Sequence, residues 1–173
     1  ISVAGAVATG THGSGNAHGS LSTAVAALEM VTAEGEVVTL ARGDAGFEGA
    51  VVALGALGVV TRVTLEVGPA FAVRQNVYEA LSLAEAEAHF DEITGLAYSV
   101  SLFSDWRGPS FNQLWVKRRV RAGEQFDAPP EVFGARRAVT ALHPIPGASP
   151  VNCTEQLGRV GAWHERLPHF KLE

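Results

Sequence analysis

The sequence predicts an α+β fold whose two parts meet at Gly68-Pro69. Three patterns carry this prediction. Residues 25–41 hold two strand-like runs around turn residues, as in a β-hairpin. Residues 59–67 alternate apolar and polar side chains until Gly68-Pro69 ends the strand. Residues 71–119 follow a strand–helix–strand–strand order, which is typical of an antiparallel α+β module.

The first part opens with small residues over 2–15, including Gly5, Gly10, Gly13 and Gly15. Glycines permit turns with positive φ, and such turns can point several backbone amides at one anion. We therefore expect this segment to be a loop that holds a phosphate or pyrophosphate group.

The remaining elements of the first part follow in order. A short helical turn is expected after this loop, with Ser20 or Ser22 as its N-cap. The hairpin comes next, with strands at 25–32 and 37–41. Asp44 is then expected to cap a helix, because apolar residues recur at helical spacing between 47 and 57.

The second part begins with a strand over 71–80. An amphipathic helix over 82–93 follows, with Ser82 as its cap, and two more strands are expected at 98–103 and 112–119. Prolines prevent long elements after residue 122, yet aromatic side chains continue. We expect an ordered excursion across a domain face there, and we expect the three tryptophans to lie in the core: Trp106, Trp115 and Trp163.

Charge and composition exclude several partners. The net charge of −5 argues against nucleic acid, and the basic run 117–121 is interpreted as a solvated strand end. No apolar run is long enough to span a bilayer, so no membrane partner is expected. The single cysteine, Cys153, is expected to be buried and inert in a reducing, cytoplasmic compartment. Because the chain starts at Ile1 and its one methionine is Met30, we expect an internal fragment that lacks N- and C-terminal parts.

Other site chemistries fit the sequence poorly. The spacing from Gly13-Ser-Gly15 to Gly19 is one residue too long for a dinucleotide fingerprint, and a triphosphate loop would need a lysine. No serine has the two flanking glycines of a hydrolase nucleophile. The histidine pairs lack further ligands at metal-binding spacing, so no metal site is expected; these pairs are His12 with His18 and His164 with His169.

Residues 1–15 and 54–61 resemble the FAD-binding domain of the vanillyl-alcohol-oxidase superfamily. Within it they are most similar to the alditol (xylitol) oxidase group, as are residues 98–107, 151–156 and 163–170. The resemblance implies that 1–69 is the second subdomain of a PCMH-type FAD-binding domain. It implies that 70–173 is the start of an α+β substrate-binding cap domain.

The resemblance further implies an FAD-dependent oxidase that converts the primary alcohol of polyols, such as xylitol and sorbitol, to the aldose while O2 becomes hydrogen peroxide. It implies no catalytic residue in this chain, which by itself is expected to be inactive. It does imply cofactor-binding residues: Ser2, Gly5, Ala8, Thr9, Gly10, Thr11, His12, Gly58, Val59 and Val60. Two alternatives stay open, a sugar-1,4-lactone oxidase or dehydrogenase of the same superfamily and a non-catalytic nucleotide- or anion-binding module.

Overall fold

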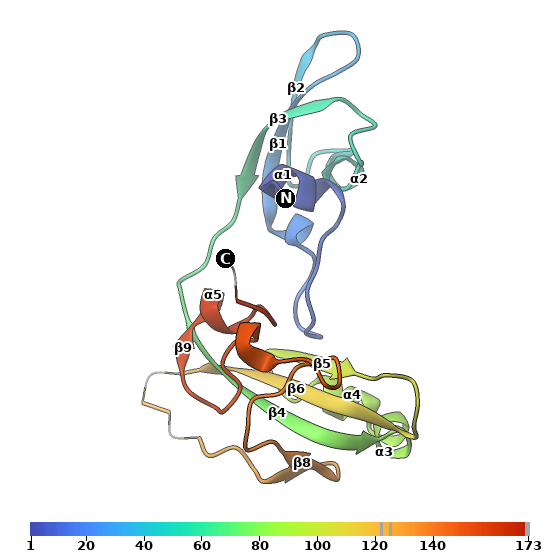
Figure 1. Ribbon diagram of the computed structural model, residues 1–173. Coiled ribbons are helices and arrows are strands. Elements are labelled where there is room, and N and C mark those ends of the chain that lie inside the picture. Colours follow the sequence, from blue (N-terminus) through green and yellow to red (C-terminus); the bar gives the residue numbers. More distant parts are fainter. Residues whose placement is uncertain (122, 125, 172–173) are drawn as a thin grey trace. The chain divides into compact units, whose positions relative to one another are not determined.

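The computed structural model describes residues 1–121, 123–124 and 126–171. The chain forms two compact units (Figure 1). The first contains Ile1–Gly13 and His18–Pro69, and the second contains Ser14–Ala17 and the chain from Ala70 onward. Each unit combines helices with an antiparallel sheet, so the predicted α+β class is confirmed.

The sheet of the first unit has the strand order β2-β1-β3. Strand β1 (Val25–Val31) pairs antiparallel with β2 (Val37–Ala41), which confirms the predicted hairpin. Strand β3 (Val59–Leu65) pairs with the other edge of β1 and ends two residues earlier than predicted. Because side chains alternate along a strand, Leu28 and Met30 share one face of β1, and both are buried there.

Three short helices accompany this sheet: α1 (Val3–Ala8), the 3-10 turn η1 (Leu21–Ala24) and α2 (Phe47–Val51). Val7 of α1 and Phe47 of α2 pack with β1 to form the core of the unit.

Two local predictions for the first unit were wrong. The expected loop over 2–15 begins as helix α1, because the Ser2 hydroxyl accepts a hydrogen bond from the Gly5 amide and alanine favours helix. Asp44 does not cap α2; that position belongs to Gly46. The Asp44 carboxylate instead accepts from the Ala41 amide at 2.8 Å, at the end of β2.

The sheet of the second unit is built on two long strands (Figure 1). Strand β4 (Ala72–Ser82) pairs antiparallel with β6 (Ser110–Val120) along its length, and β5 (Ser99–Phe103) pairs with the far edge of β6. On the other edge of β4 lie β8 (Ala135–Arg137), then β7 (Glu131–Val132), and the two-residue β9 (Gly161–Ala162).

Two helices cover one face of this sheet. The structure divides the predicted helix 82–93 at His89 into α3 (Leu83–Ala88) and α4 (Phe90–Thr94), because His89 leaves helical geometry with φ −126° and ψ 29°. The predicted cap is confirmed, since the Ser82 hydroxyl accepts from the Glu85 amide at 3.0 Å. The core on this face is made of buried side chains from the helices and strands: Tyr78, Leu81, Ala86, Ile93, Val100, Leu114 and Ala135.

The segment after residue 138 covers the other face, which confirms the expected ordered excursion. It contains η2 (Pro150–Asn152) and α5 (Trp163–Arg166) as well as β9. Its Cys153 packs against Trp115 of β6, so both residues are buried as predicted. The prediction was wrong for Trp106, which is 87% exposed at a turn, and for Trp163, which is 43% exposed. None of the described helices is long and apolar enough to cross a membrane.

Candidate functional site

The ten residues predicted to bind the cofactor all lie in the first unit, on two segments. The first segment is α1 with the five positions around it. Ser2 caps the start of α1, where its Oγ lies 3.1 Å from the Gly5 amide nitrogen. Ala8 is the last helical residue and Thr9 is the C-cap. Four of the polar side chains on this segment are exposed, and none carries a fixed charge: Ser2, Thr9, Thr11 and His12.

The glycine at position 10 ends α1. Gly10 has a φ of +62°, its amide donates to the Val7 carbonyl at 3.0 Å, and the Thr11 amide donates to the Ala6 carbonyl at 2.9 Å. This pair of bonds is the Schellman motif of a helix C-terminus. The Thr9 amide also donates to a helix carbonyl, that of Gly5. These three amides are therefore committed to α1 and are not presented to an anion.

Side chains supply the remaining polar groups of this segment. The Thr9 hydroxyl donates to the Gly5 carbonyl at 2.9 Å and lies 3.1 Å from the Thr11 hydroxyl. The Nδ1 atom of His12 lies 3.1 Å from the Gly13 carbonyl oxygen, and the ring is exposed. The segment thus presents hydroxyl groups and an imidazole ring to solvent.

The second predicted segment starts β3. Gly58 has a φ of +147°, and a Cβ placed on it would lie 2.3 Å from the Val31 carbonyl oxygen, so only glycine fits. Val59 pairs with Val31 in the sheet, and its side chain is 71% exposed. Val60 is partly buried and packs against the core of the unit.

The fold brings the end of α1 next to the start of β3. Ala8 lines the same small apolar cavity as Gly58 and Val60. The Leu54 amide donates to the Ala8 carbonyl at 3.3 Å, which ties the end of α1 to the segment before β3. Ser2 lies at the opposite end of α1, so the structure gathers the predicted residues along one helix and one strand start.

No protein-family model matches the chain. An alditol oxidase from a Streptomyces species is 51% identical to it over 173 residues, which is all of this chain and 40% of that protein. This likeness covers both units and both predicted segments. The chain is similar to this alditol oxidase along its whole length. It spans less than half the length of that relative.

More distant relatives match parts of the chain. An L-gulono-1,4-lactone dehydrogenase from Mycobacterium tuberculosis is 43% identical over 91 residues, which is 53% of this chain and 21% of that protein. A D-arabinono-1,4-lactone oxidase from Eremothecium gossypii is 31% identical over 125 residues, 71% of this chain and 23% of that protein. Parts of the chain are therefore similar in sequence to proteins named for lactones.

Among solved structures, a cholesterol oxidase from Brevibacterium sterolicum superimposes with a TM-score of 0.54. The match covers 66% of this chain and 25% of that enzyme at 21% identity. At 21% identity this likeness shows only that the matched part of the chain shares the fold of that enzyme.

The second unit contains a buried polar cluster that sequence patterns did not single out. Lys117 is 1% exposed, and its ammonium donates to the Leu167 carbonyl, so the interpretation of 117–121 as a solvated strand end was wrong at this residue. Lys117 pairs across the sheet with Gln75 and Ser99. Burial lowers the pKa of Lys117 to about 8. Alternation along β6 was the available signal, since it places Lys117 on the face of the buried Trp115.

His169 completes this cluster from the C-terminal segment. Its Nε2 lies 3.1 Å from the Ser101 hydroxyl, and its ring packs beside those of Phe103 and Trp115. Burial, and secondarily the charge of Lys117, lower the pKa of His169 to about 4. Ser14, which belongs to the second unit, lies 2.6 Å from the Ser99 hydroxyl and extends the cluster.

The remaining candidate groups are less reactive. Burial raises the pKa of the Cys153 thiol, so the thiolate form is disfavoured at neutral pH. Within the described ranges, no three or more His, Cys, Asp or Glu side chains are placed to hold a metal ion.

Proposed function

We propose that the chain is part of an FAD-dependent oxidase that converts the primary alcohol of a polyol to the aldose. Two hydrogens leave the alcohol and O2 is reduced to hydrogen peroxide, with xylitol and sorbitol as the expected substrates. The observation that carries this proposal is the 51% identity to an alditol oxidase along the whole chain.

FAD, when bound, supplies the acceptor that takes hydride from the alcohol carbon and passes the electrons to O2. This chain's part is to hold it, through the segment from Ser2 to His12 and the start of β3 at Gly58–Val60. The chemistry of these groups supports this role, because exposed neutral donors can solvate a diphosphate and the first 41 residues contain no lysine or arginine.

The contact proposed here differs from the one expected from the sequence, in which backbone amides hold the anion. Since the Thr9, Gly10 and Thr11 amides bond to α1 carbonyls, the donors that remain on this segment include the hydroxyls of Ser2 and Thr11 and the His12 ring. The cofactor would then meet side chains there, and the Gly10 turn would act by placing Thr11 and His12.

The two units have separate roles in this proposal. Residues 1–69 belong to the FAD-binding domain, and residues 70–173 begin the substrate-binding cap. The groups that react with the alcohol come from other parts of the polypeptide. The single cysteine supports a reducing, cytoplasmic compartment.

The substrate that triggers peroxide release distinguishes this proposal from the second candidate, a lactone oxidase or dehydrogenase, which the 43% identity over 91 residues supports. The protein in its complete natural reading frame is expected to release peroxide with xylitol and sorbitol. It should give at most a small response to L-gulono-1,4-lactone and D-arabinono-1,4-lactone. If only lactones are turned over, the proposed substrate is a lactone and not a polyol. If neither class of substrate gives peroxide, the oxidase proposal is refuted.

A further inference from the structure

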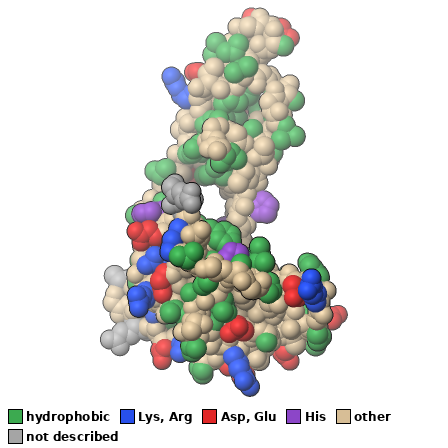
Figure 2. Space-filling model, in the orientation of Figure 1, with side chains coloured by type: hydrophobic (Ala, Val, Ile, Leu, Met, Phe, Trp, Pro, Cys, Tyr) green, Lys and Arg blue, Asp and Glu red, His purple; other side chains and the backbone are tan. Residues whose placement is uncertain are grey.

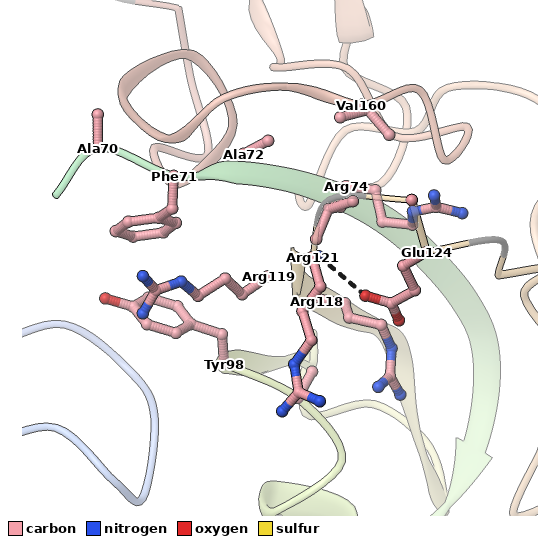
Figure 3. A pocket seen from close by; sticks show the side chains of 13 residues that line it. Ala70, Phe71, Ala72, Arg74, Tyr98, Arg118, Arg119, Arg121, Glu124 and Val160 are labelled. Atoms are coloured by element: carbon pink, nitrogen blue, oxygen red, sulfur yellow. Dashed lines mark hydrogen bonds between the residues drawn. The ribbon is translucent and has the colours of Figure 1, made fainter.

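Four arginines gather around one pocket of the second unit (Figure 3). They are Arg74 on β4, Arg118 and Arg119 near the end of β6, and Arg121 just beyond it. Among the described residues that line the pocket, Glu124 is the only acidic one. The chain as a whole carries a net charge of −5, so this local excess of positive charge runs against its composition.

Two of these arginines are part of the framework. Arg74 donates to the Phe126 carbonyl, and Arg118 donates to the Leu96 carbonyl at 3.2 Å. Both guanidiniums also lie over the Phe126 ring, at 5.5 Å for Arg74 and 4.4 Å for Arg118. Their positions are therefore fixed by the fold, and they supply a positive field to the pocket.

The other two arginines keep their side-chain donors free. The Arg119 guanidinium lies 4.3 Å from the centre of the Phe71 ring, and Figure 3 shows it beside Phe71 and Tyr98. Stacking holds the plane of the guanidinium while the N–H groups at its edge stay open. Within the described residues, the side chains of Arg119 and Arg121 form no hydrogen bond, and none of the four arginines forms an ion pair.

Glu124 offsets only one of the four positive charges. Its carboxylate accepts a hydrogen bond from the Arg121 backbone amide at 2.9 Å, which closes the turn after β6 (Figure 3). Like charges that line one pocket repel, by about 1 kcal/mol per pair at about 4 Å in water and by less at longer range. A bound anion would offset that repulsion, and guanidinium forks match the two oxygens of a phosphate or carboxylate.

We propose that this pocket is an anion-binding site in which Arg119 and Arg121 each offer guanidinium donors to a small molecule that carries phosphate or carboxylate groups. The pocket has a volume of about 1330 Å³ and is wider than the roughly 300–1,000 Å³ usual for small-molecule sites. The ligand is therefore held by charge and by the Arg119 fork more than by enclosure, so a multiply charged anion binds best and salt weakens the binding.

Calorimetric titration of the chain at low ionic strength tests the site, with inorganic phosphate and citrate as separate probes. Saturable binding of at least one probe is expected, and the stronger probe identifies the phosphate or carboxylate class. Arg119→Gln and Arg121→Gln should each weaken binding about tenfold or more, because each removes a charged donor. Arg119→Lys should restore binding only in part, since lysine keeps the charge but loses the fork.

Arg107→Gln serves as the matched control, because Arg107 is exposed and lies outside the pocket lining. It should bind the probe as the unaltered chain does, and circular dichroism should show that every variant is folded. Absence of saturable binding, or equal affinity in the Arg107, Arg119 and Arg121 variants, would overturn the proposal. This result would leave the oxidase function untouched.

Discussion

Replacing Gly58 with alanine is expected to lower the free energy of unfolding of the first unit by about 3 kcal/mol or more. The added Cβ would lie 2.3 Å from the Val31 carbonyl oxygen and 3.0 Å from the Val31 carbonyl carbon. Both atoms belong to the backbone of β1, and the next residue, Val59, pairs with Val31 in the sheet. The clash can therefore be relieved only by breaking the β1–β3 ladder.

Gly55→Ala is the matched control for this substitution. Gly55 also has a positive φ, +79°, but apart from its own atoms and those of its two chain neighbours no described heavy atom lies within 4 Å of the position of its Cβ. Alanine there adds only backbone strain, which costs about 1–2 kcal/mol. Chemical unfolding followed by circular dichroism measures both losses. If Gly58→Ala loses no more than Gly55→Ala, the close approach of Gly58 to β1 is contradicted.

Tryptophan fluorescence adds a separate signal to this experiment. Trp106, Trp115 and Trp163 all lie in the second unit, so fluorescence reports the unfolding of that unit alone. If the first unit of the Gly58→Ala variant unfolds before the second, the circular dichroism signal should change at a lower denaturant concentration than the fluorescence signal.

The second large expected effect is a loss of folding stability at acidic pH, caused by His169. Burial lowers the pKa of His169 from 6.5 to about 4 in the folded chain. Between these two values the unfolded chain binds a proton that the folded chain does not, so stability is lost as the pH falls from 6.5 toward 4. Because the ring is only partly buried, solvent screens part of this effect, and from pH 7 to pH 5 this residue alone should account for a loss of about 1 kcal/mol.

His169→Gln isolates this contribution from the carboxylates that titrate in the same range. The variant should be less stable at pH 7, because the packing of the ring with Phe103 and Trp115 is lost. Its further loss between pH 7 and pH 5 should be smaller than that of the unaltered chain by about 1 kcal/mol, the screened contribution of the partly buried ring. Fluorescence-detected unfolding measures both slopes. His164→Gln, at an exposed position, should keep the original slope, and an unchanged slope in His169→Gln would contradict the burial of a neutral imidazole.

Local patterns predicted the elements that local chemistry decides. The hairpin over 25–41 depends on turn residues between β-branched runs, and the Ser82 cap depends on a hydroxyl three residues before the Glu85 amide. Helix α1 was missed because glycine and alanine are compatible with both loop and helix. Its helical form depends on the Ser2 cap, the Gly10 C-terminus and the burial of Val7.

The other features of the fold depend on contacts between residues that are far apart in the sequence, so local patterns could not predict them. Strands β8 and β9 have only three and two residues and depend on β4 for their hydrogen bonds. The burial of Lys117 depends on a cover that lies 50 residues later, at Leu167. The same holds for the candidate site. Small residues suggested an anion contact near Gly10, but spacing alone could not show that the amides there bond to α1 or that Ala8 lies beside Gly58.

The central claim is that the segment from Ser2 to His12 holds the flavin of an alditol oxidase, and flavin content tests it most directly. The protein in its complete reading frame should purify with about one flavin per chain, measured by visible absorbance. Gly10→Val should lose most of it, because a β-branched residue at φ +62° displaces Thr11 and His12. Gly35→Val, with equal strain at φ +82° in the hairpin turn, should keep it. A colourless parent protein, or a folded Gly10→Val variant with full flavin, would contradict the claim.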